Sequence, residues 1–309
     1  YNHRNMLIQA LGVYGGESID CRMTCLLVNG SIALDAGSLS QALPIERQVG
    51  VHSIVLSHSH MDHTNSLPFF IENVYGKSDR PIDLYASEAT VYAIRKYLFN
   101  NATWPDFTRL PNHLLPAVRF HEFETEVPFT IDGVQFTPIA VDHLVPTHGF
   151  LIEQGESAVL WSSDTGPTQR LWEIANRTQN LRAICIETSF DNALQEIADL
   201  SFHLTPATLD KELKKLERRV PILLHHLKPP CVEKIKAEVR ALANPDLVYT
   251  TLAGALKQNV EQVKKISLPK FLSPPTAPAE LKEIADAIYE YGLVDKPIDV
   301  AGFTMLPGR

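Results

Sequence analysis

The sequence has no hydrophobic run that approaches the roughly 20 residues of a membrane-spanning helix. We therefore expect no membrane partner. Of its 309 residues, 45% are hydrophobic and 21% are charged, which is the ordinary composition of a soluble globular protein. This length is sufficient for one large domain with a substantial core, or for two domains at most.

The chain also lacks an excess of basic residues, since its formal net charge is −8. A protein that binds a nucleic-acid polymer normally presents a basic face to the phosphates. The composition therefore argues against such a partner. It does not exclude a single nucleotide, because metal cations could hold one phosphate locally.

Cysteine is scarce, and the four cysteines show neither Cys-x-x-Cys spacing nor the density of a disulfide-bonded scaffold. We expect Cys185 to be a core residue and Cys21 and Cys25 to be reduced. The sequence begins with Tyr1 and not with Met, which we interpret as a fragment, a processed form or a trimmed chain. A signal peptide would not be visible, so a cytoplasmic and a periplasmic location both stay open.

Histidine, in contrast, is concentrated in one place. The apolar run 54–56 predicts a buried strand, and four side chains that can bind metal follow it within six positions: His58, His60, Asp62 and His63. Alternate residues of an extended segment share a face, so His58 and His60 point the same way. Imidazole and carboxylate groups suit Zn²⁺, Mn²⁺ or Fe. The pattern indicates a metal site, whereas the alternative is a polar loop that is rich in histidine by chance.

The same arrangement recurs later in the chain, where an apolar strand ends and a potential ligand follows. Trp161 precedes Asp164, and Leu224 precedes His225 and His226. Sites in α/β sheets lie just beyond the carboxyl ends of strands, so these residues are expected to converge. The segment 142–150 offers both His143 and His148. The residues alone do not decide between the two histidines of either pair.

The remaining pattern predicts alternating strands and helices. Asn29-Gly30 indicates a tight hairpin, Ser87 caps a helix over 87–99, and Thr205 with Pro206 begins another over 205–219. Further strands are expected at 6–8, 25–28, 31–34, 134–136, 149–152, 158–161, 182–187, 221–224 and 247–251, and further helices at 167–177 and 231–242.

Two segments do not fit this pattern. Residues 100–130 are predicted to form a loop-rich insertion, in which Trp104 and Phe107 either stack on a purine or attach the insertion to the core. Residues 268–309 are predicted to form a Pro-rich linker and a terminal helix over 279–291, separate from a catalytic domain at 1–267. The apolar stripe of that helix favours a homodimer contact, with packing on the domain as the alternative.

The motifs resemble those of the metallo-β-lactamase superfamily and, within it, the class II cyclic-nucleotide phosphodiesterases. The resemblance implies an α/β fold, an αββα four-layer sandwich with a C-terminal helical extension and the site along one edge. The matching segments, spread over most of the chain, are Leu34–Ser38, the His-x-His-x-Asp-His run 58–63, 100–108, 142–150, 163–166, 187–190, His203–Pro206 and His226–Pro229.

The resemblance further implies a centre of two divalent ions, with Zn expected and Mn or Fe as alternatives. One ion would be bound by His58, His60 and His143, the other by Asp62, His63 and His226, with Asp164 between them. Asp62 would orient a hydroxide held between the ions, and His203 would face the scissile phosphate as an acid, unless it only caps or packs against a helix. Supporting positions are Asp35 beside the metal loop, Glu187 as a brace for a ligand histidine, and His148 facing the substrate or the insertion.

The implied function is hydrolysis of a 3′,5′-cyclic nucleotide, cAMP or cGMP, to the 5′-monophosphate, with a small molecule as the only substrate. Three alternatives remain: a lactone, thioester or β-lactam hydrolase, a tRNA 3′-end-processing nuclease, and a non-catalytic nucleotide-binding protein. The sequence leaves open the native metal, the preferred base and the physiological pathway.

Overall fold

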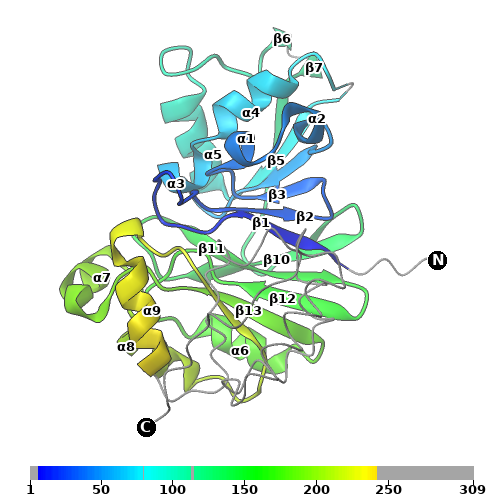
Figure 1. Ribbon diagram of the computed structural model, residues 1–309. Helices are drawn as coiled ribbons and strands as arrows, with labels where there is room; N and C mark the ends of the chain where they lie inside the picture. Colours follow the sequence, from blue (N-terminus) through cyan, green and yellow to red (C-terminus); the bar gives the residue numbers. More distant parts are fainter. Residues whose placement is uncertain (1–5, 79, 113–114, 242–309) are drawn as a thin grey trace, which may run out of the picture.

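Two six-stranded sheets form the centre of the molecule (Figure 1). The structure is a computed structural model that describes residues 6–241 except 79 and 113–114. The first sheet has the order β1 (Ile8–Gly12), β2 (Cys25–Val28), β3 (Ile32–Leu34), β4 (Ser53–Val55), β5 (Ile82–Ala86) and β8 (Val118–Glu122). The second has the order β14 (Ile222–His225), β13 (Leu181–Glu187), β12 (Ser157–Trp161), β11 (Thr147–Gln154), β10 (Val134–Val141) and β9 (Phe129–Ile131).

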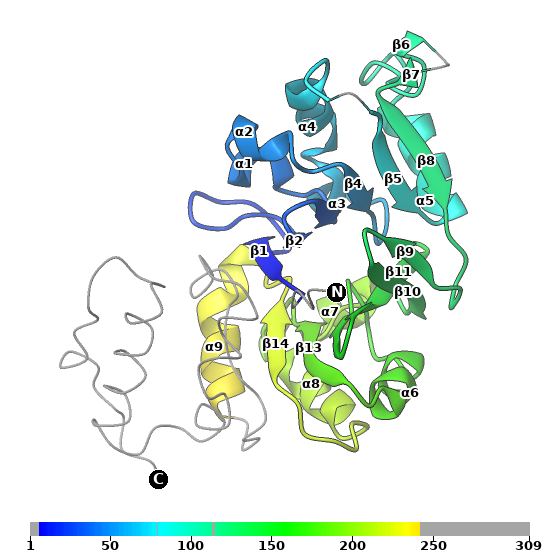
Figure 2. The same cartoon turned by 90° about the vertical axis from the view of Figure 1, so that its right-hand side faces the viewer.

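Helices cover the outer face of each sheet (Figures 1 and 2). The first sheet is covered by α1 (Leu39–Ala42), α2 (Ile45–Gln48), α4 (Leu67–Val74) and α5 (Glu88–Ala93), which continues as a π-helix over Ile94–Leu98. The second is covered by α6 (Arg170–Arg177), α8 (Pro206–Leu213) and α9 (Val232–Ala241), while α3 (Met61–Thr64) and α7 (Gln195–Ser201) lie at one end of the sandwich. The expected αββα architecture is confirmed. None of the described helices is long and apolar enough to cross a membrane.

Within the first sheet, β2, β3 and β4 are buried on both faces, which explains their largely continuous apolar runs. Along β2, Leu26 and Val28 belong to the core between the sheets, whereas Cys25 and Leu27 pack beneath the outer helices. Phe136 and Phe150 extend the central core from the second sheet. Because both faces are closed by packing, the ends of the strands are where side chains can form a site.

Several local predictions are confirmed. Asn29 and Gly30 have positive φ angles of 51° and 77°, as the tight hairpin between β2 and β3 requires. The Ser87 hydroxyl accepts a hydrogen bond from the Thr90 amide at the start of α5, and Thr205 caps α8. The helix at 205–219 was predicted too long, because α8 ends at Leu213.

The segment 100–130 is not simply a loop-rich insertion, which corrects the prediction. It contains the short strands β6 (Pro111–Asn112) and β7 (Leu115–Pro116), and also β8, which pairs in parallel with β5. Arg119 and Glu122 are exposed because β8 is the last strand of its sheet, so the strand lacks an apolar run. The expected strand 247–251, the linker and the terminal helix lie outside the described residues, as does the domain boundary at 267.

Candidate metal centre

All seven predicted ligands lie just beyond strands or on α3, at the same end of the sandwich. His58 follows β4, His60 precedes α3, and α3 carries Asp62 and His63. From the second sheet, His143 follows β10, Asp164 follows β12 and His226 follows β14. Short links to strands fix each side chain with little freedom, so residues distant in sequence meet accurately.

The ligands form two groups that share one aspartate. The first group is His58, His60, His143 and Asp164, and the second is Asp62, His63, Asp164 and His226. Within each group, the potential ligand atoms lie within 4.8 Å of one another. This is the division that the resemblance implies.

The donor atoms fit a metal ion better than they fit each other. His58 Nε2, His63 Nε2 and Asp164 Oδ1 are buried and have no hydrogen-bond partner among the described residues. His143 Nε2 lies 3.3 Å from His60 Nδ1, and His226 Nε2 lies 3.1 Å from Asp164 Oδ2. Ligands bound at about 2.0–2.1 Å to one tetrahedral ion lie roughly 3.3 Å apart. The arrangement is therefore that of atoms directed at shared cations.

The protonation states also suit a cation. Burial lowers the pKa of His143 to about 4 and that of His58 well below its ordinary value, so both imidazoles are neutral. Burial opposes ionisation of Asp164, but His226 and His63 hold its pKa well below the usual range. His63 is the exception, because Asp164 and Asp35 outweigh burial and raise its pKa well above the ordinary value. Between these two carboxylates, a bound cation would replace the proton.

Asp35 orients one histidine of each group. Its Oδ2 accepts a hydrogen bond of 2.5 Å from His63 Nδ1 and another of 2.9 Å from the Ser57 hydroxyl. The Ser57 oxygen in turn lies 2.9 Å from His58 Nδ1 and accepts its proton. Because both Nδ1 atoms are occupied, both Nε2 atoms are left for a metal. The expected role of Asp35 beside the metal loop thus acquires a specific geometry.

Glu187 makes a matching arrangement on the other side. Its Oε1 accepts a hydrogen bond of 2.6 Å from His203 Nδ1, and its Oε2 accepts one of 3.0 Å from the Ser189 hydroxyl. The Ser189 oxygen lies 2.9 Å from His226 Nδ1. Glu187 therefore braces the ligand His226 through a serine and holds His203 directly. Neither Ser57 nor Ser189 was identified from the sequence, because serine is common in loops.

His203 stands beside the ligands without belonging to either group. Its ring centroid lies 5.0 Å from that of His143 and 5.2 Å from that of His226. Burial lowers its pKa, but Glu187 outweighs burial and raises it above the ordinary value. The suggestion that His203 merely caps a helix is wrong, because Thr205 caps α8. His203 is therefore a buried side chain at the edge of the centre, hydrogen-bonded through Nδ1 to Glu187.

Four residues around the centre have left-handed backbone conformations that are unfavourable for residues other than glycine. They are Asp35, Ser163, Phe202 and His226, with φ between 54° and 60°. Each such conformation costs about 1–2 kcal/mol for a residue with a Cβ. Strain of this kind concentrates at functional sites, where it directs side chains that regular structure could not.

Phe202 links α7 to the centre. Its φ of 54° and ψ of 58° end the helix, and the next amide, that of His203, donates to the Ala198 carbonyl at 2.9 Å. The Phe202 carbonyl lies 3.2 Å from His143 Nδ1 and accepts its proton, which leaves His143 Nε2 for a metal. Lys228 is a second unforeseen neighbour, with Nζ 3.4 Å from Asp62 Oδ2. It belongs to the His-Leu-Lys-Pro motif, which could have revealed it.

Two of the ambiguous histidines point away from the centre. His148 lies edge-on to Phe123, with 5.2 Å between ring centroids, and its Nε2 lies 2.9 Å from Thr125 Oγ1. It therefore faces the end of segment 100–130, one of its two expected surroundings. His225 stacks on Trp161, with 5.6 Å between centroids, because β14 directs it to the other side of the sheet from His226.

Trp104 and Phe107 are not at the centre. Phe107 is only 6% exposed and packs against Tyr75 and Phe99. Trp104 lies edge-on to Phe69, with 5.2 Å between ring centroids. A stacking role for Phe107 is wrong, since its faces are covered. Attachment of the segment to the core is the role that the structure supports for both.

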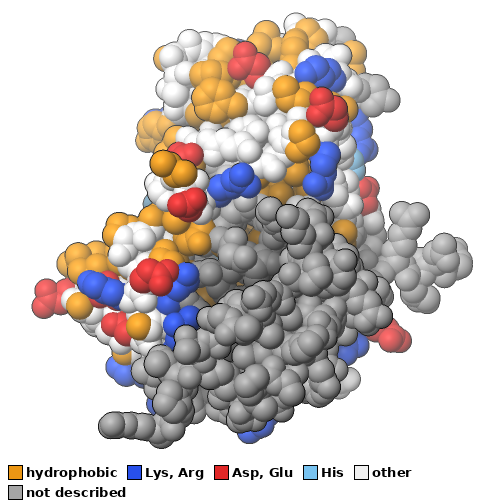
Figure 3. Space-filling view, in the orientation of Figure 1, with side chains coloured by type: hydrophobic (Ala, Val, Ile, Leu, Met, Phe, Trp, Pro, Cys, Tyr) orange, Lys and Arg blue, Asp and Glu red, His pale blue; other side chains and the backbone are white. Residues whose placement is uncertain are grey.

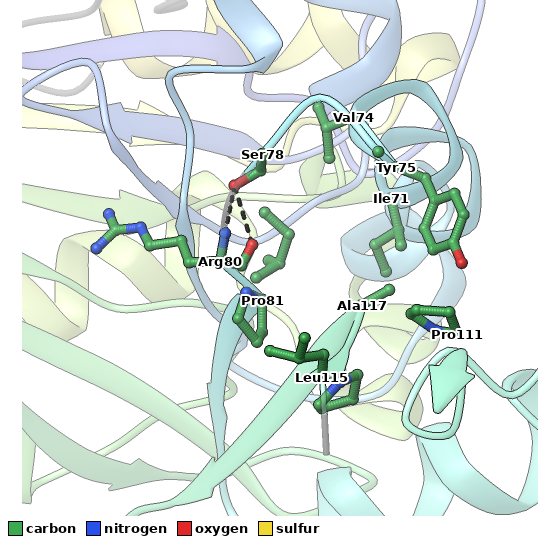
Figure 4. A pocket seen from close by; sticks show the side chains of 12 residues that line it. Ile71, Val74, Tyr75, Ser78, Arg80, Pro81, Pro111, Leu115 and Ala117 are labelled. Carbon is green, nitrogen blue, oxygen red and sulfur yellow. Dashed lines mark hydrogen bonds between the residues drawn. The ribbon is translucent and has the colours of Figure 1, made fainter. Parts of the chain in front are cut away.

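A cavity of about 280 Å³ lies at the opposite end of the first sheet (Figure 4). It is formed by α4, the start of β5 and the β6–β7 hairpin, and includes Ile71, Tyr75, Arg80 and Leu115. None of the residues that line it in the described part of the chain is a predicted site residue. The centre at the other end is the functional candidate.

An αββα sandwich that brings together histidine and aspartate side chains able to hold divalent metal is typical of metal-binding hydrolases. The chain belongs to the family described as "Beta-lactamase superfamily domain", which matches residues 24–226. This match confirms the resemblance to the metallo-β-lactamase superfamily. The resemblance to the cyclic-nucleotide phosphodiesterases is confirmed by a relative that is described as a probable enzyme of that kind.

That relative is the probable 3′,5′-cyclic-nucleotide phosphodiesterase of Yersinia pestis, which is 28% identical, with 72% of this chain and 78% of the relative covered. The fold is similar to that of unliganded yeast PDE1, with a TM-score of 0.65, 16% identity and coverage of 78% and 94% of the two chains. It is also similar to the short form of human tRNase Z (ELAC1), with a TM-score of 0.55, 16% identity and coverage of 72% and 93%.

Proposed function

We propose that the protein hydrolyses a 3′,5′-cyclic nucleotide to the 5′-monophosphate at a centre of two divalent ions. Histidine nitrogens and carboxylate oxygens favour zinc, with manganese or iron as alternatives. When bound, such ions supply positive charge for the phosphate oxygens and lower the pKa of water towards neutrality. Similarity to the probable cyclic-nucleotide phosphodiesterase of Yersinia pestis supports this substrate class.

The observation that carries the proposal is the Glu187–His203 pair beside the two ligand groups. Hydrolysis joins a water oxygen to phosphorus and breaks the bond from phosphorus to the 3′ oxygen of ribose. That oxygen would depart as an alkoxide, a poor leaving group, so it needs a proton. His203 donates the proton from its Nε2, and Glu187 stabilises the charged ring through Nδ1. The attacking water releases a proton to solvent, and His203 takes up a proton from solvent before the next turnover.

Two of the other candidate substrates, a thioester and a tRNA, fit the centre and the chain less well. A thioester releases a thiolate, which departs without protonation. A tRNA requires a basic surface, whereas the net charge of this chain is −8. The similarity to human tRNase Z is 16% in sequence and reflects the fold. A small phosphodiester with an alkoxide leaving group therefore matches the centre best.

The test compares substrates that differ in leaving group. Zinc-loaded protein is assayed with cAMP, cGMP, a 2′,3′-cyclic nucleotide, a lactone and a thioester, and the products are identified by chromatography. We expect the 3′,5′-cyclic nucleotides to be the best substrates. His203→Ala should slow their hydrolysis by roughly 10²–10⁴-fold but largely spare bis(p-nitrophenyl) phosphate, whose phenolate leaves unaided.

His121→Ala is the matched control, because His121 is bound to Asp83 on the first sheet, with 2.7 Å between His121 Nε2 and Asp83 Oδ1. Metal content and melting temperature are measured for both variants. Equal losses on the cyclic nucleotide and on the nitrophenyl ester would contradict the acid role of His203. Faster turnover of the lactone or thioester would contradict the substrate class.

A further inference from the structure

Apolar side chains accompany the two histidines at the α7 side of the centre. Leu144 follows His143 and is 58% exposed, and Phe202 precedes His203 and is 36% exposed. Phe190 lies edge-on to His203, with 5.7 Å between ring centroids. Figure 3 shows hydrophobic side chains gathered over α7 at this end of the molecule. The polar centre is thus bordered on one side by an apolar surface.

Phe202 occupies a position where folding favours glycine. It follows the last residue of α7 in a left-handed conformation, and the amides of Phe202 and His203 bond back to Asp199 and Ala198. This is the helix-ending motif in which glycine is the usual residue. Neither hydrophobic cluster of the described residues includes Phe202. An aromatic ring here strains the backbone without contributing to the core.

The backbone of Phe202 is nevertheless fixed by the site. Its carbonyl accepts the proton of His143 Nδ1 at 3.2 Å, and its neighbour His203 is held by Glu187 at 2.6 Å. The Cα–Cβ bond of Phe202 is therefore held at a constant place relative to His143 and His203. A molecule whose phosphate binds at the centre would extend its uncharged part across this border.

We propose that Phe202, with Leu144 and Phe190, forms the surface that receives the nucleobase of the substrate. The inference rests on the proposed function only in placing a nucleotide phosphate at the centre. A purine is a flat aromatic system, and stacking on one aromatic side chain strengthens binding by about 5- to 150-fold. Phe202 is then a specificity-determining residue that distinguishes nucleotides from other phosphate esters.

The experiment measures binding with and without the base. Titration calorimetry gives the dissociation constants of AMP, GMP and ribose 5-phosphate for zinc-loaded protein. The variants are Phe202→Ala, Phe202→Gly and the control Leu200→Ala, which removes another apolar side chain of α7 that is 78% exposed. We expect the wild type to bind at least one nucleotide about 5- to 150-fold more tightly than ribose 5-phosphate. Both Phe202 variants should lose this preference, and Leu200→Ala should keep it.

A stability measurement separates contact from packing. If the ring serves binding, Phe202→Gly relieves the backbone and its melting temperature is equal to or above that of the wild type. A marked fall for this variant would mean that the ring stabilises the fold, and would overturn the inference. So would an equal loss of affinity for nucleotides and ribose 5-phosphate, which would show an effect through His143. Absence of any base preference in the wild type would overturn it too.

These outcomes are independent of the reaction. Wild-type protein that prefers nucleotides but hydrolyses no cyclic nucleotide would refute the proposed function and leave the role of Phe202 standing. Protein that hydrolyses cyclic nucleotides without any preference for the base would support the proposed function and refute the role of Phe202.

Discussion

Substitutions of Ser57 and Ser189 test how hydrogen bonds support the two groups of candidate metal ligands. Ser57→Ala removes the hydroxyl between Asp35 and His58, which lies 2.9 Å from each. His63 keeps its direct bond to Asp35. The change should therefore weaken metal binding by the group of His58, His60 and His143 and largely spare metal binding by the other group. Ser189→Ala, which disconnects His226 from Glu187, should have the opposite effect.

The size of the effect follows from what each substitution leaves behind. A buried imidazole N–H without a partner costs about 1–3 kcal/mol, and it no longer fixes which nitrogen faces the metal. Loss of such a supporting bond typically lowers metal affinity 10–100-fold. Replacing serine by alanine removes one oxygen atom, so the fold should be retained.

The assay is a zinc titration against a competing chelator, with the metal content determined by elemental analysis. Each variant should show one site of nearly wild-type affinity and one site weakened 10–100-fold. Mutation of the local ligands His60→Ala in one background and Asp62→Ala in the other assigns which site is weakened. Two unaffected sites in both variants, or the same site weakened in both, would refute the reasoning.

Three further predictions concern the same centre. The Asp164→Ala variant should keep its fold but lose at least one ion and the activity, because two cations would face each other without the shared carboxylate. Elemental analysis and circular dichroism check this, and two retained ions with normal turnover would contradict it. Gly15→Ala should weaken metal binding, since an added Cβ would lie 2.5 Å from His226 Cε1; Gly16→Ala, whose Cβ would have 3.2 Å to Pro229, is the milder control, and equal metal affinities would refute the clash. Removing the metal with a chelator should destabilise the fold by about 4 kcal/mol for each ion, relative to a metal concentration 1,000 times the dissociation constant, or roughly 10 °C in melting temperature per ion. An unchanged scanning calorimetry trace would argue against a metal bound to the folded state.

Local patterns in the sequence indicated the strands and the candidate ligands, whereas the sandwich and the division of the ligands into two groups were implied by the resemblance to the metallo-β-lactamase superfamily. Apolar runs identify strands buried on both faces, and the His-x-His-x-Asp-His run places four ligands after one of them. The residues alone could not choose His226 over His225. The structure separates them, because His225 ends β14 against Trp161 and His226 turns away with a φ of 60°.

What the sequence could not predict depends on distant partners. Ser57 and Ser189 act only because Asp35 and Glu187 lie beside them in the fold. The helix α7 was not expected, since it has only seven residues and Ala198 is its one buried residue. The role proposed for Phe202 depends on its left-handed backbone conformation, which a phenylalanine in the sequence does not predict.

The polar residues of β8, which prevented its prediction as a strand, also affect how the edge of the sheet can associate with other molecules. As the last strand of the first sheet within the described residues, it presents backbone groups to which another chain could add a strand. Arg119 and Glu122 are exposed along it, and such charges disfavour the growth of a continuous sheet between molecules. Replacing both by valine would make the strand easy to recognise and would create a starting point for aggregation.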